Sequence, residues 1–398
     1  MYSEECKVTR KKILFVTSRL PYPPIGGEKL KSHWLLKILS KHYDIHLVSL
    51  SEKKIPDEFY KWAQEIGITF KIFKKRRVSY FFAGLRSLFN VLPFQVNYFY
   101  FKDVQNYISS IYKAFDLIFS VLIRTAKYVM DLEKPKILEM TDAISLNYKK
   151  SLQKTTSLKW KLIYKIEYPR LVKFEKKCAR VFNKTLLVNK EEAEYLDYDK
   201  KIVWLPNGVS ERLLTYEKKN PRYKNCICFY GKMNYQPNID AVMWFVENVL
   251  PRLNEEIKFC IVGTNPTNKI KKLEKKYHNV IVTGFVQDPY EILKSCLCVV
   301  APMQTGAGIQ NKVLESMALG TVNIVSSLSA KPIGAKSYEH FIIEDNPKKI
   351  AEIIHDIYSG SKKYESIKLR SRKYIKNNFT WDIYEDKLIE IIEKLLNK

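Results

Sequence analysis

Two patterns of apolar positions recur along the chain: short continuous apolar runs, and apolar residues spaced three and four apart. Both occur within the first 50 residues. An apolar, β-prone run at 11–17 continues into a Pro/Gly-rich loop at 21–27. Apolar residues spaced three and four apart then extend from Leu30 to Leu39, before a second apolar run at 44–50. These patterns predict a strand, a loop, a helix and a strand, which together form one βαβ unit.

Similar runs continue along the chain and predict two α/β series. The expected strands are 116–121, 136–140, 185–188 and 203–205 in the first series, and 226–230, 258–262, 280–283, 298–301 and 322–326 in the second; the expected helices include 239–250, 309–319 and 381–396. Alternating strands and helices form parallel sheets, which bind ligands beyond the carboxyl ends of their strands. The turn at 206–208 separates the two series, so we expect a ligand cleft between two domains.

Length and composition narrow the class of protein. A chain of 398 residues with 46% hydrophobic residues suits two globular domains. The charged segment 1–12 does not resemble a signal peptide, and the longest apolar run, 87–101, is too short to span a membrane, so we expect a cytoplasmic protein. The seven cysteines show no CxxC spacing and are interpreted as reduced core residues; we expect Cys226 and Cys228, and likewise Cys296 and Cys298, to share a strand face.

The net charge of +26 favours anionic partners, and two segments carry much of it. Segment 70–102 has seven basic residues, no acidic one and eleven aromatics, and segment 149–180 has eleven basic and two acidic residues. Such a surface suits peripheral contact with an anionic membrane, here the inner face of the cell membrane. Alternatively, the aromatics are core and the lysines are a solvated face of a lysine-rich protein. Charge alone also suggests nucleic acid, but no zinc-finger, RRM-type or basic-zipper signature is present, so we expect no nucleic-acid partner.

The loop at 305–309 and the helix behind it carry the clearest candidate chemistry. Gly306 and Gly308 allow close backbone approach, and the helix N-terminus offers amides and a positive dipole end to a diphosphate. Lys312 lies one turn into the helix, and Glu315 follows on the same face, where a carboxylate can accept hydrogen bonds from a ribose diol. The alternative is an ordinary glycine loop with a solvated Lys–Glu pair.

The run 306–320 (GAGIQNKVLESMALG) closely resembles the donor motif of GT-B glycosyltransferases, specifically retaining glycosyltransferase family four. Further motifs resemble that family in order: 20–27 its N-terminal glycine loop, 141–145 a second active-site loop, 206–209 the hinge, 231–233 with 237–238 the first loop of the C-terminal domain, 282–286 the nucleobase turn, and 379–381 the start of the returning terminal helix. The resemblance covers nearly the whole chain. It implies two Rossmann-like domains facing a cleft: an acceptor domain, 1–207 with the returning helix 379–398, and a donor domain, 208–378.

The same resemblance implies a metal-independent enzyme without a cofactor, which moves a sugar from a nucleoside-diphosphate sugar to a glycan or lipid-linked hydroxyl acceptor. Lys232 and Lys312 would neutralise the diphosphate, Glu315 would hold the ribose, and Asp142 would orient the sugar or the acceptor. Asp142 is equally well interpreted as the N-cap of a helix at 143–148. The other expected donor contacts are Gly26, Gly27, Gly284, Phe285, Thr305, Gly306, Ala307, Gly308, Ile309 and Leu314.

Ala307 departs from the family pattern, because many members carry a glutamate eight positions before the residue that matches Glu315. Backbone amides of 306–309 would then have to hold the donor hydroxyls. Two alternatives stay open within the fold: a GT-B epimerase or hydrolase, which needs ionisable groups beside the sugar, and an inactive scaffold, which only Ala307 suggests. A role in polysaccharide or lipid-linked glycan assembly follows from the family resemblance alone.

Overall fold

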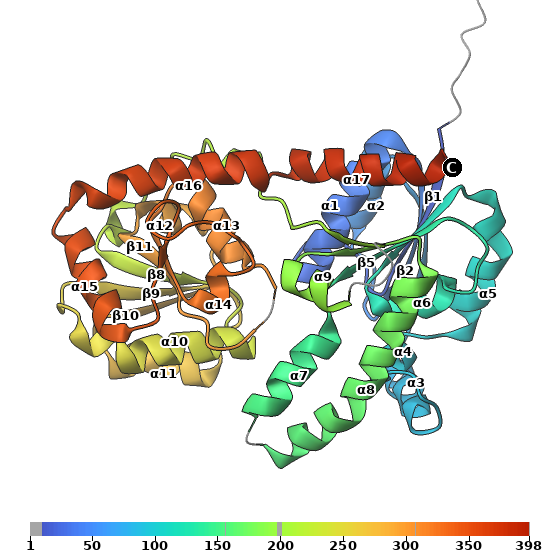
Figure 1. Ribbon diagram of the computed structural model, residues 1–398, viewed down its shortest axis with the longest axis horizontal. Helices are drawn as coiled ribbons and strands as arrows, with labels where there is room; N and C mark the ends of the chain where they lie inside the picture. Colours follow the sequence, from blue (N-terminus) through green and yellow to red (C-terminus); the bar gives the residue numbers. More distant parts are fainter. Residues whose placement is uncertain (1–9, 156, 197–200, 307, 398) are drawn as a thin grey trace, which may run out of the picture. The chain divides into compact units, whose positions relative to one another are not determined.

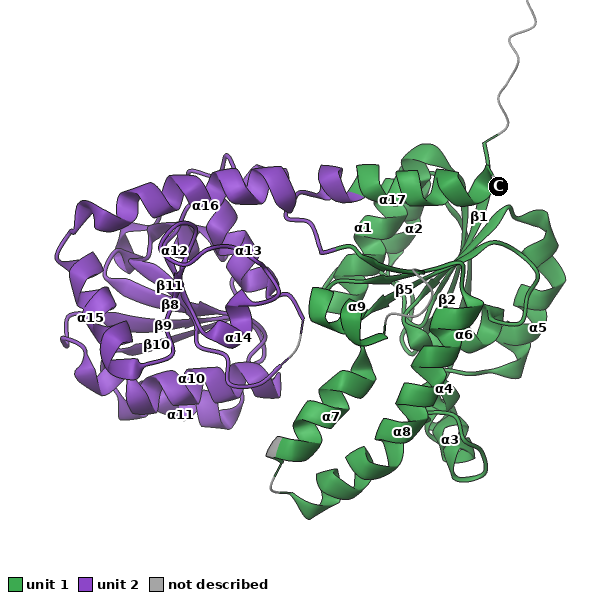
Figure 2. Cartoon of the chain, in the orientation of Figure 1, with its two compact units in different colours: residues 1–205, 385–398 green, residues 206–384 purple. Residues whose placement is uncertain are grey.

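The computed structural model describes residues 10–155, 157–196, 201–306 and 308–397, and the chain divides into two compact units (Figure 1). Unit 1 comprises residues 1–205 with 385–398, and unit 2 comprises residues 206–384 (Figure 2). Each unit contains one parallel β-sheet with helices on its faces (Figure 1). The predicted α/β class with two Rossmann-like domains is therefore confirmed.

Unit 1 is built on a seven-stranded sheet of order β3-β2-β1-β4-β5-β6-β7, in which every strand pair is parallel. The strands are β1 (Lys12–Thr17), β2 (Asp44–Ser51), β3 (Thr69–Lys74), β4 (Leu117–Val121), β5 (Lys136–Thr141), β6 (Lys184–Leu187) and β7 (Ile202–Trp204). The helices are α1 (Gly27–His42), α2 (Asp57–Glu65), α3 (Arg77–Leu85), α4 (Phe94–Tyr98), α5 (Lys102–Ile111), α6 (Ile123–Val129), α7 (Ile144–Lys154), α8 (Leu158–Val181) and α9 (Lys190–Leu196). The order reverses between β1 and β4, which is the topological switch point of this sheet.

Unit 2 repeats this topology in a six-stranded sheet of order β10-β9-β8-β11-β12-β13, again with parallel pairs. Its strands are β8 (Cys226–Tyr230), β9 (Lys258–Val262), β10 (Val280–Gly284), β11 (Cys298–Ala301), β12 (Asn323–Val325) and β13 (Ile342–Ile343). Its helices are α10 (Gln236–Asn248), α11 (Asn268–Lys276), α12 (Tyr290–Ser295), α13 (Asn311–Ala318), α14 (Ser327–Ala330), α15 (Pro347–Tyr358) and α16 (Glu365–Asn378). The switch point lies between β8 and β11.

The last helix, α17 (Trp381–Leu396), begins in unit 2 and ends in unit 1. Its C-terminal part is joined to the end of α1 and the residue after it. Glu385 pairs with Lys41 at 2.6 Å and with His42 at 2.8 Å, and the Tyr43 hydroxyl donates to Glu393 at 2.6 Å. These contacts make the end of the chain an integral part of unit 1.

The structure differs from the sequence-based expectations at several element boundaries. Helix α10 begins at Gln236, earlier than the expected 239, because Pro237 fits the first turn of a helix. Helix α13 begins at Asn311, two residues after the expected start. The expectation that Cys296 shares a strand face with Cys298 is wrong, since Cys296 is the C-cap of α12. The six cysteines described are free, and no described helix is long and apolar enough to cross a membrane.

Candidate active site

The loops after β8 and β11 flank the switch point of unit 2, where ligands bind in doubly wound sheets. The loop after β8 begins with Gly231, and a Cβ atom on Gly263 after β9 would lie 1.7 Å from the Gly231 carbonyl oxygen. A Cβ on Gly231 would meet the Asn238 side chain at 2.8 Å, and one on Gly306 would meet Pro237 at 3.6 Å. The loops after β8 and β11 therefore converge on the first turn of α10.

Lys312 lies at the centre of this group and is buried, with 8% of its surface exposed. Its Nζ donates to Asn238 Oδ1 at 2.5 Å, lies 3.6 Å from Met303 Sδ, and stands 4.5 Å from the Phe229 ring centroid. Burial lowers the pKa of Lys312 to about 7. Asn238 Nδ2 also donates to the carbonyl oxygen of Lys232 at 2.9 Å, while the Lys232 side chain is exposed. The two predicted lysines are thus connected through Asn238.

The N-terminus of α13 carries no side-chain cap, and its N-cap residue is Gln310. The amides of Val313 and Leu314 donate to the Gln310 carbonyl at 2.9 and 3.2 Å, whereas those of Asn311 and Lys312 have no backbone partner among the described residues. Such amides at a helix N-terminus suit an anion.

The remaining residues of the predicted loop differ in backbone conformation and in burial. Gly306 and Gly308 have φ of 107° and 83°, values that glycine adopts without steric cost. Thr305 is half-buried, whereas the side chains of Ile309 and Leu314 pack in the core of unit 2. Ala307 lies outside the described residues.

Glu315 is half-buried beside aromatic and cationic side chains that the sequence did not single out. Burial raises the pKa of Glu315 to about 7, against a hydrogen bond from Tyr290 and the positive charge of Arg212. The Arg212 guanidinium lies 5.7 Å from the centroid of the Tyr290 ring. Tyr290 could have been identified from the sequence by its position, because it follows the predicted nucleobase turn by a few residues and begins helix α12.

Gly284 and Phe285 of that turn lie at the end of the edge strand β10, two strands away from β8. Gly284 has a φ of 66°, and Phe285 is 74% exposed. An exposed ring at the carboxyl end of a strand is available for stacking against a planar ligand. Strand β9 lies between β10 and β8, and among the described residues no hydrogen bond, ion pair or ring contact joins Phe285 to the group around Lys312.

In unit 1, the predicted Gly26 and Gly27 lie at the N-terminus of α1, directly after the β1 loop. A Cβ atom on either glycine would meet no described protein atom within 4 Å. Glu28 holds the loop, because it accepts from the Ser18 hydroxyl at 2.6 Å and pairs with Arg124 of α6 at 2.9 Å. The backbone at Gly26 and Gly27 is therefore fixed and accessible.

Asp142 follows β5 and is half-buried, and burial together with the nearby charge of Glu139 raises its pKa to about 6. The alternative interpretation of Asp142 as a helix N-cap is not supported, because the N-cap of α7 is Ala143 and no side chain caps it. The Asp142 carboxylate is therefore not engaged in helix capping.

Two buried glutamates from α8 and α9 hold the start of α7 in its place. Glu192 accepts from the Ala143 amide at 2.9 Å, and Glu175 accepts from the Ser145 amide at 3.0 Å and from the Ser145 hydroxyl. Burial raises the pKa of Glu192 to about 9 and that of Glu175 to about 7. These carboxyl groups fix the loop that carries Asp142, and no local pattern in the sequence indicates them.

A buried ion pair lies close to Asp142. Lys31 Nζ of α1 is 3.6 Å from the Glu139 carboxylate of β5, and the two side chains are 3% and 0% exposed. Burial lowers the pKa of Lys31, and the Glu139 charge acts in the opposite direction. The pair connects the helix that follows Gly27 to the strand that precedes Asp142, which joins the two predicted loops of unit 1.

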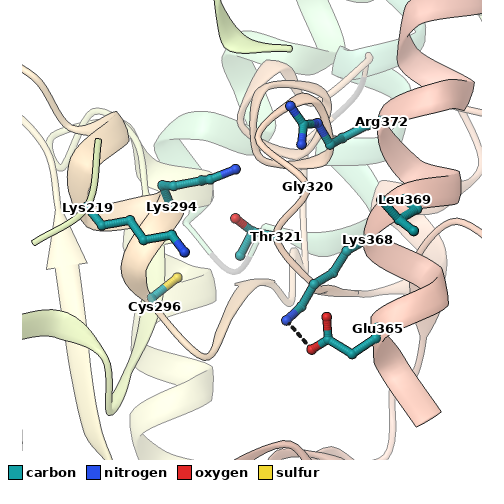
Figure 3. A pocket seen from close by; sticks show the side chains of 9 residues that line it. All are labelled: Lys219, Lys294, Cys296, Gly320, Thr321, Glu365, Lys368, Leu369 and Arg372. Atoms are coloured by element: carbon teal, nitrogen blue, oxygen red, sulfur yellow. Dashed lines mark hydrogen bonds and ion pairs between the residues drawn. The ribbon is translucent and has the colours of Figure 1, made fainter. Parts of the chain in front are cut away.

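A cavity of about 330 Å³ in unit 2 lies elsewhere, beside Gly320 after the C-terminal end of α13 (Figure 3). None of the predicted donor residues lines it. Lys294 and Arg372 pair with Glu217 at 3.4 and 3.6 Å, and Lys368 pairs with Glu365 at 2.6 Å, so much of its positive charge is compensated within the protein. Among the described residues, no group of three or more His, Cys, Asp or Glu side chains is arranged to hold a metal ion.

Residues 224–359 match the protein family described as "Glycosyl transferases group 1". A Klebsiella pneumoniae protein described as an uncharacterised 44.6 kDa protein in the cps region is 22% identical over 92% of this chain and 96% of its own length. An uncharacterised glycosyltransferase of Methanocaldococcus jannaschii is 23% identical over 46% of this chain and 48% of its own length.

Solved structures share the fold at low sequence identity. HepE of Anabaena in complex with UDP has a TM-score of 0.66 and 12% identity, over 96% of this chain and all of that one. Sucrose-phosphate synthase of Thermosynechococcus elongatus has a TM-score of 0.68 and 13% identity, over 98% of this chain and 100% of that one. These neighbours support a GT-B fold, and the family match over residues 224–359 supports a glycosyltransferase.

Proposed function

We propose that this protein is a retaining, metal-independent glycosyltransferase that moves a sugar from a nucleoside-diphosphate sugar to a hydroxyl acceptor. The observation that carries the proposal is the group at the switch point of unit 2, where Asn238 connects Lys312 with the Lys232 backbone beside the uncapped start of α13. The α13 amides and the Lys312 ammonium group, held beside the Lys232 backbone, suit a diphosphate. The solved HepE structures contain UDP and UDP-glucose, which supports the same class of donor here.

In the proposed reaction, Lys232, Lys312 and the α13 amides stabilise the negative charge that develops on the leaving diphosphate. Cationic side chains thereby supply what a metal ion supplies in other transferases. Glu315 accepts hydrogen bonds from the ribose hydroxyls, and Phe285 stacks near the base. Glycines 26 and 27 leave the backbone at the start of α1 open to the acceptor, since a Cβ atom at either position would meet no described atom within 4 Å.

The bond between the sugar and the diphosphate breaks on the same face on which the acceptor oxygen attacks, so the sugar keeps its anomeric configuration. The departing phosphate oxygen takes the proton of the acceptor hydroxyl, and no separate base is required. Asp142 orients the sugar or the acceptor hydroxyl. Glu175 and Glu192 hold its loop by accepting hydrogen bonds from backbone amides.

The proposed acceptor is a growing polysaccharide or a lipid-linked glycan on the cytoplasmic side of the membrane. This choice of acceptor rests on the resemblance of the run 306–320 to the donor motif of glycosyltransferase family four. The basic segments of unit 1 support peripheral contact with an anionic membrane, since cationic side chains are attracted to its surface.

The first experiment is thermal unfolding with UDP, GDP, ADP and TDP, each with and without EDTA. A ligand at roughly 100 times its Kd adds about 2.7 kcal/mol to the free energy of unfolding, which raises Tm visibly. We expect one base to raise Tm, EDTA to leave the rise unchanged, and Glu315→Ala to remove it. Glu247→Ala, an exposed change on α10 of the same unit, is the matched control.

The second step is transfer from the labelled sugar of that nucleotide, followed by NMR of the product to read its anomeric configuration. No rise in Tm with any nucleotide would contradict the donor site, and an inverted product would contradict the retaining mechanism. Loss of transfer in EDTA would contradict metal independence. Donor turnover to free sugar or an epimer, without an acceptor product, would favour the hydrolase or epimerase alternative.

A further inference from the structure

Helix α3 and the segment after it expose large apolar side chains on the surface of unit 1. The exposed fraction rises from 41% for Phe94 to 87% for Phe89, and the members are Val78, Phe81, Phe82, Leu88, Phe89, Val91 and Phe94. Val78, Phe81 and Phe82 recur at helical spacing on α3, opposite the buried Tyr80, Ala83 and Gly84. The apolar face of this helix therefore points partly to solvent, which is unusual for a monomeric surface.

The N-terminal part of α8 shows the same property. Leu158 is 83% exposed, Trp160 49%, Leu162 61% and Ile166 46%, and the buried residues of this helix begin only at Glu167. Leu158, Leu162 and Ile166 are four residues apart, so they form one stripe along the helix. The rest of α8 packs into the core of unit 1 through Leu171, Phe174 and Cys178.

These two groups belong to one surface. The Phe94 amide donates to the Glu167 carboxylate at 2.7 Å, which joins the start of α4 to α8. A Cβ atom on Gly84 would lie 2.6 Å from the Phe94 ring, so α3 packs directly on the same segment. In Figure 1, α3 and the α7–α8 hairpin both extend away from the sheet of unit 1. We refer to residues 74–94 and 158–166 as the apolar-basic surface.

The charge of this surface is positive. Exposed cations alternate with the apolar side chains, and Lys74, Arg76, Lys159, Lys161 and Lys165 make no ion pair within the described part of the chain. The neighbouring acids Glu52 and Asp103 pair with Arg77 at 3.6 Å and Lys75 at 2.6 Å. Glu167 is buried and accepts from Phe94 and Arg170.

We propose that the apolar-basic surface docks on an anionic lipid bilayer, with its aromatic and aliphatic side chains at the depth of the headgroups. This inference rests on the proposed function only for the side of the membrane and the use of the contact. Lysine and arginine at the surface are attracted by anionic lipids, while exposed apolar side chains gain by leaving water.

Charge complementarity selects the bilayer over other occupants. A second copy of this chain would bring the same unpaired cations against each other, which like-charge repulsion disfavours. A nucleic acid would satisfy the cations but leave most of the exposed aliphatic side chains in water. An anionic bilayer attracts the cations and also removes the apolar side chains from water. It would present unit 1 to an acceptor anchored in lipid.

The test is co-sedimentation of the full chain with vesicles of phosphatidylcholine, alone or mixed with phosphatidylglycerol, at low and high salt. We expect binding to the mixed vesicles that falls with salt, and weaker binding to the neutral ones. The variants Phe81→Ser/Phe82→Ser and Lys159→Glu/Lys161→Glu/Lys165→Glu should each lower the partition coefficient by about tenfold or more. Leu369→Ser on α16, 70% exposed, and Lys271→Glu/Lys272→Glu/Lys275→Glu on α11 are the matched controls and should bind as the unchanged protein does.

Each protein is also assayed for the nucleotide-dependent rise in Tm, which reports the donor site alone. Loss of vesicle binding with the rise retained supports docking through this surface. Equal binding of all variants, or no binding to anionic vesicles, would overturn the inference. Self-association that the Phe81/Phe82 change abolishes, without vesicle binding, would overturn it in favour of a dimer. A missing rise in Tm throughout would instead count against the donor site.

Discussion

The side-chain oxygen of Asn238 lies 2.5 Å from the ammonium nitrogen of Lys312, and the amide nitrogen of the same side chain donates to the Lys232 carbonyl at 2.9 Å. One asparagine thereby fixes the position of a buried cation and of the loop after β8. Because Lys312 is buried, its direction is set by this hydrogen bond and not by solvent. The proposed diphosphate site therefore depends on a residue that carries no charge.

Replacing Asn238 by alanine should weaken nucleotide binding by about tenfold or more and lower the free energy of unfolding by about 1–3 kcal/mol, because a buried donor and acceptor lose their partner. Isothermal titration calorimetry with the nucleotide found by thermal unfolding measures the first effect, and urea denaturation measures the second. Asn248→Ala, at the other end of α10, removes a bond to the Trp244 carbonyl and serves as the control. Unchanged affinity in Asn238→Ala would show that Lys312 needs no such orientation.

The pKa of Lys312, lowered to about 7, predicts that nucleotide affinity falls as pH rises above that value. The ammonium form is the one that attracts a diphosphate, and it is lost above pH 7, so affinity should fall by up to about tenfold for each pH unit. Binding at pH 8 should also take up a proton, which calorimetry detects as a dependence of the heat on the buffer. In Lys312→Met this dependence should vanish, and its persistence would assign the proton to another group.

Glu315 predicts that nucleotide affinity also falls on the acidic side of the pH profile, because burial raises the pKa of this carboxyl group to about 7. The ionised carboxylate is the form that accepts hydrogen bonds from ribose hydroxyls, so affinity should rise as pH increases towards 7. The free protein should show the reverse: a carboxyl group with a raised pKa stabilises the fold below about pH 4.5, and this stability is lost as pH rises through about 7.

Glu315→Gln checks both effects in one variant. It should flatten the acidic limb of the affinity profile, and its stability relative to the unchanged protein should increase between about pH 4.5 and pH 7. Thermal unfolding across this pH range, with and without nucleotide, separates the effect on nucleotide affinity from the effect on stability. An acidic limb that survives in Glu315→Gln would assign the titration to another carboxyl group.

The sequence predicts strands β8, β9 and β11 within one residue at each end, because buried parallel strands are short, continuous apolar runs. It assigns no element to β3, since this edge strand (TFKIFK) is half-exposed and its lysines resemble the basic segment that follows. The start of α13 is also displaced, because the glycine loop continues two residues further than the apolar spacing indicates.

For the site, the glycine loop and the lysine and glutamate behind it are local patterns, and the sequence identifies them directly. The partners of those residues are not local. Asn238 meets Lys312 across 74 positions of sequence, and Lys31 of helix α1 reaches Glu139 of strand β5. Only the packing of strands and helices brings such groups together, and no spacing in the sequence reports it.

The Lys31–Glu139 pair gives a prediction for stability. Lys31→Met should lower the free energy of unfolding by about 3–5 kcal/mol, because it leaves the Glu139 charge buried without this counter-ion. The double variant Lys31→Met/Glu139→Leu should recover most of that loss, since both charges are then absent. Urea denaturation at pH 7 measures both.

Lys37→Met, an exposed change on the same helix, should alter stability by less than about 1 kcal/mol. A double variant as unstable as Lys31→Met alone would show that the pair itself, and not the unpaired charge, stabilises unit 1.

Helix α17 also determines the order in which the protein can be completed during synthesis. Residues 385–397 belong to unit 1 but follow the whole of unit 2 in the sequence. The contacts of Glu385 with Lys41 and of Glu393 with Tyr43 therefore cannot form until the ribosome has translated both units. Unit 2 is continuous and can close its core first. Unit 1, whose sheet comes first in the sequence, is therefore completed after unit 2.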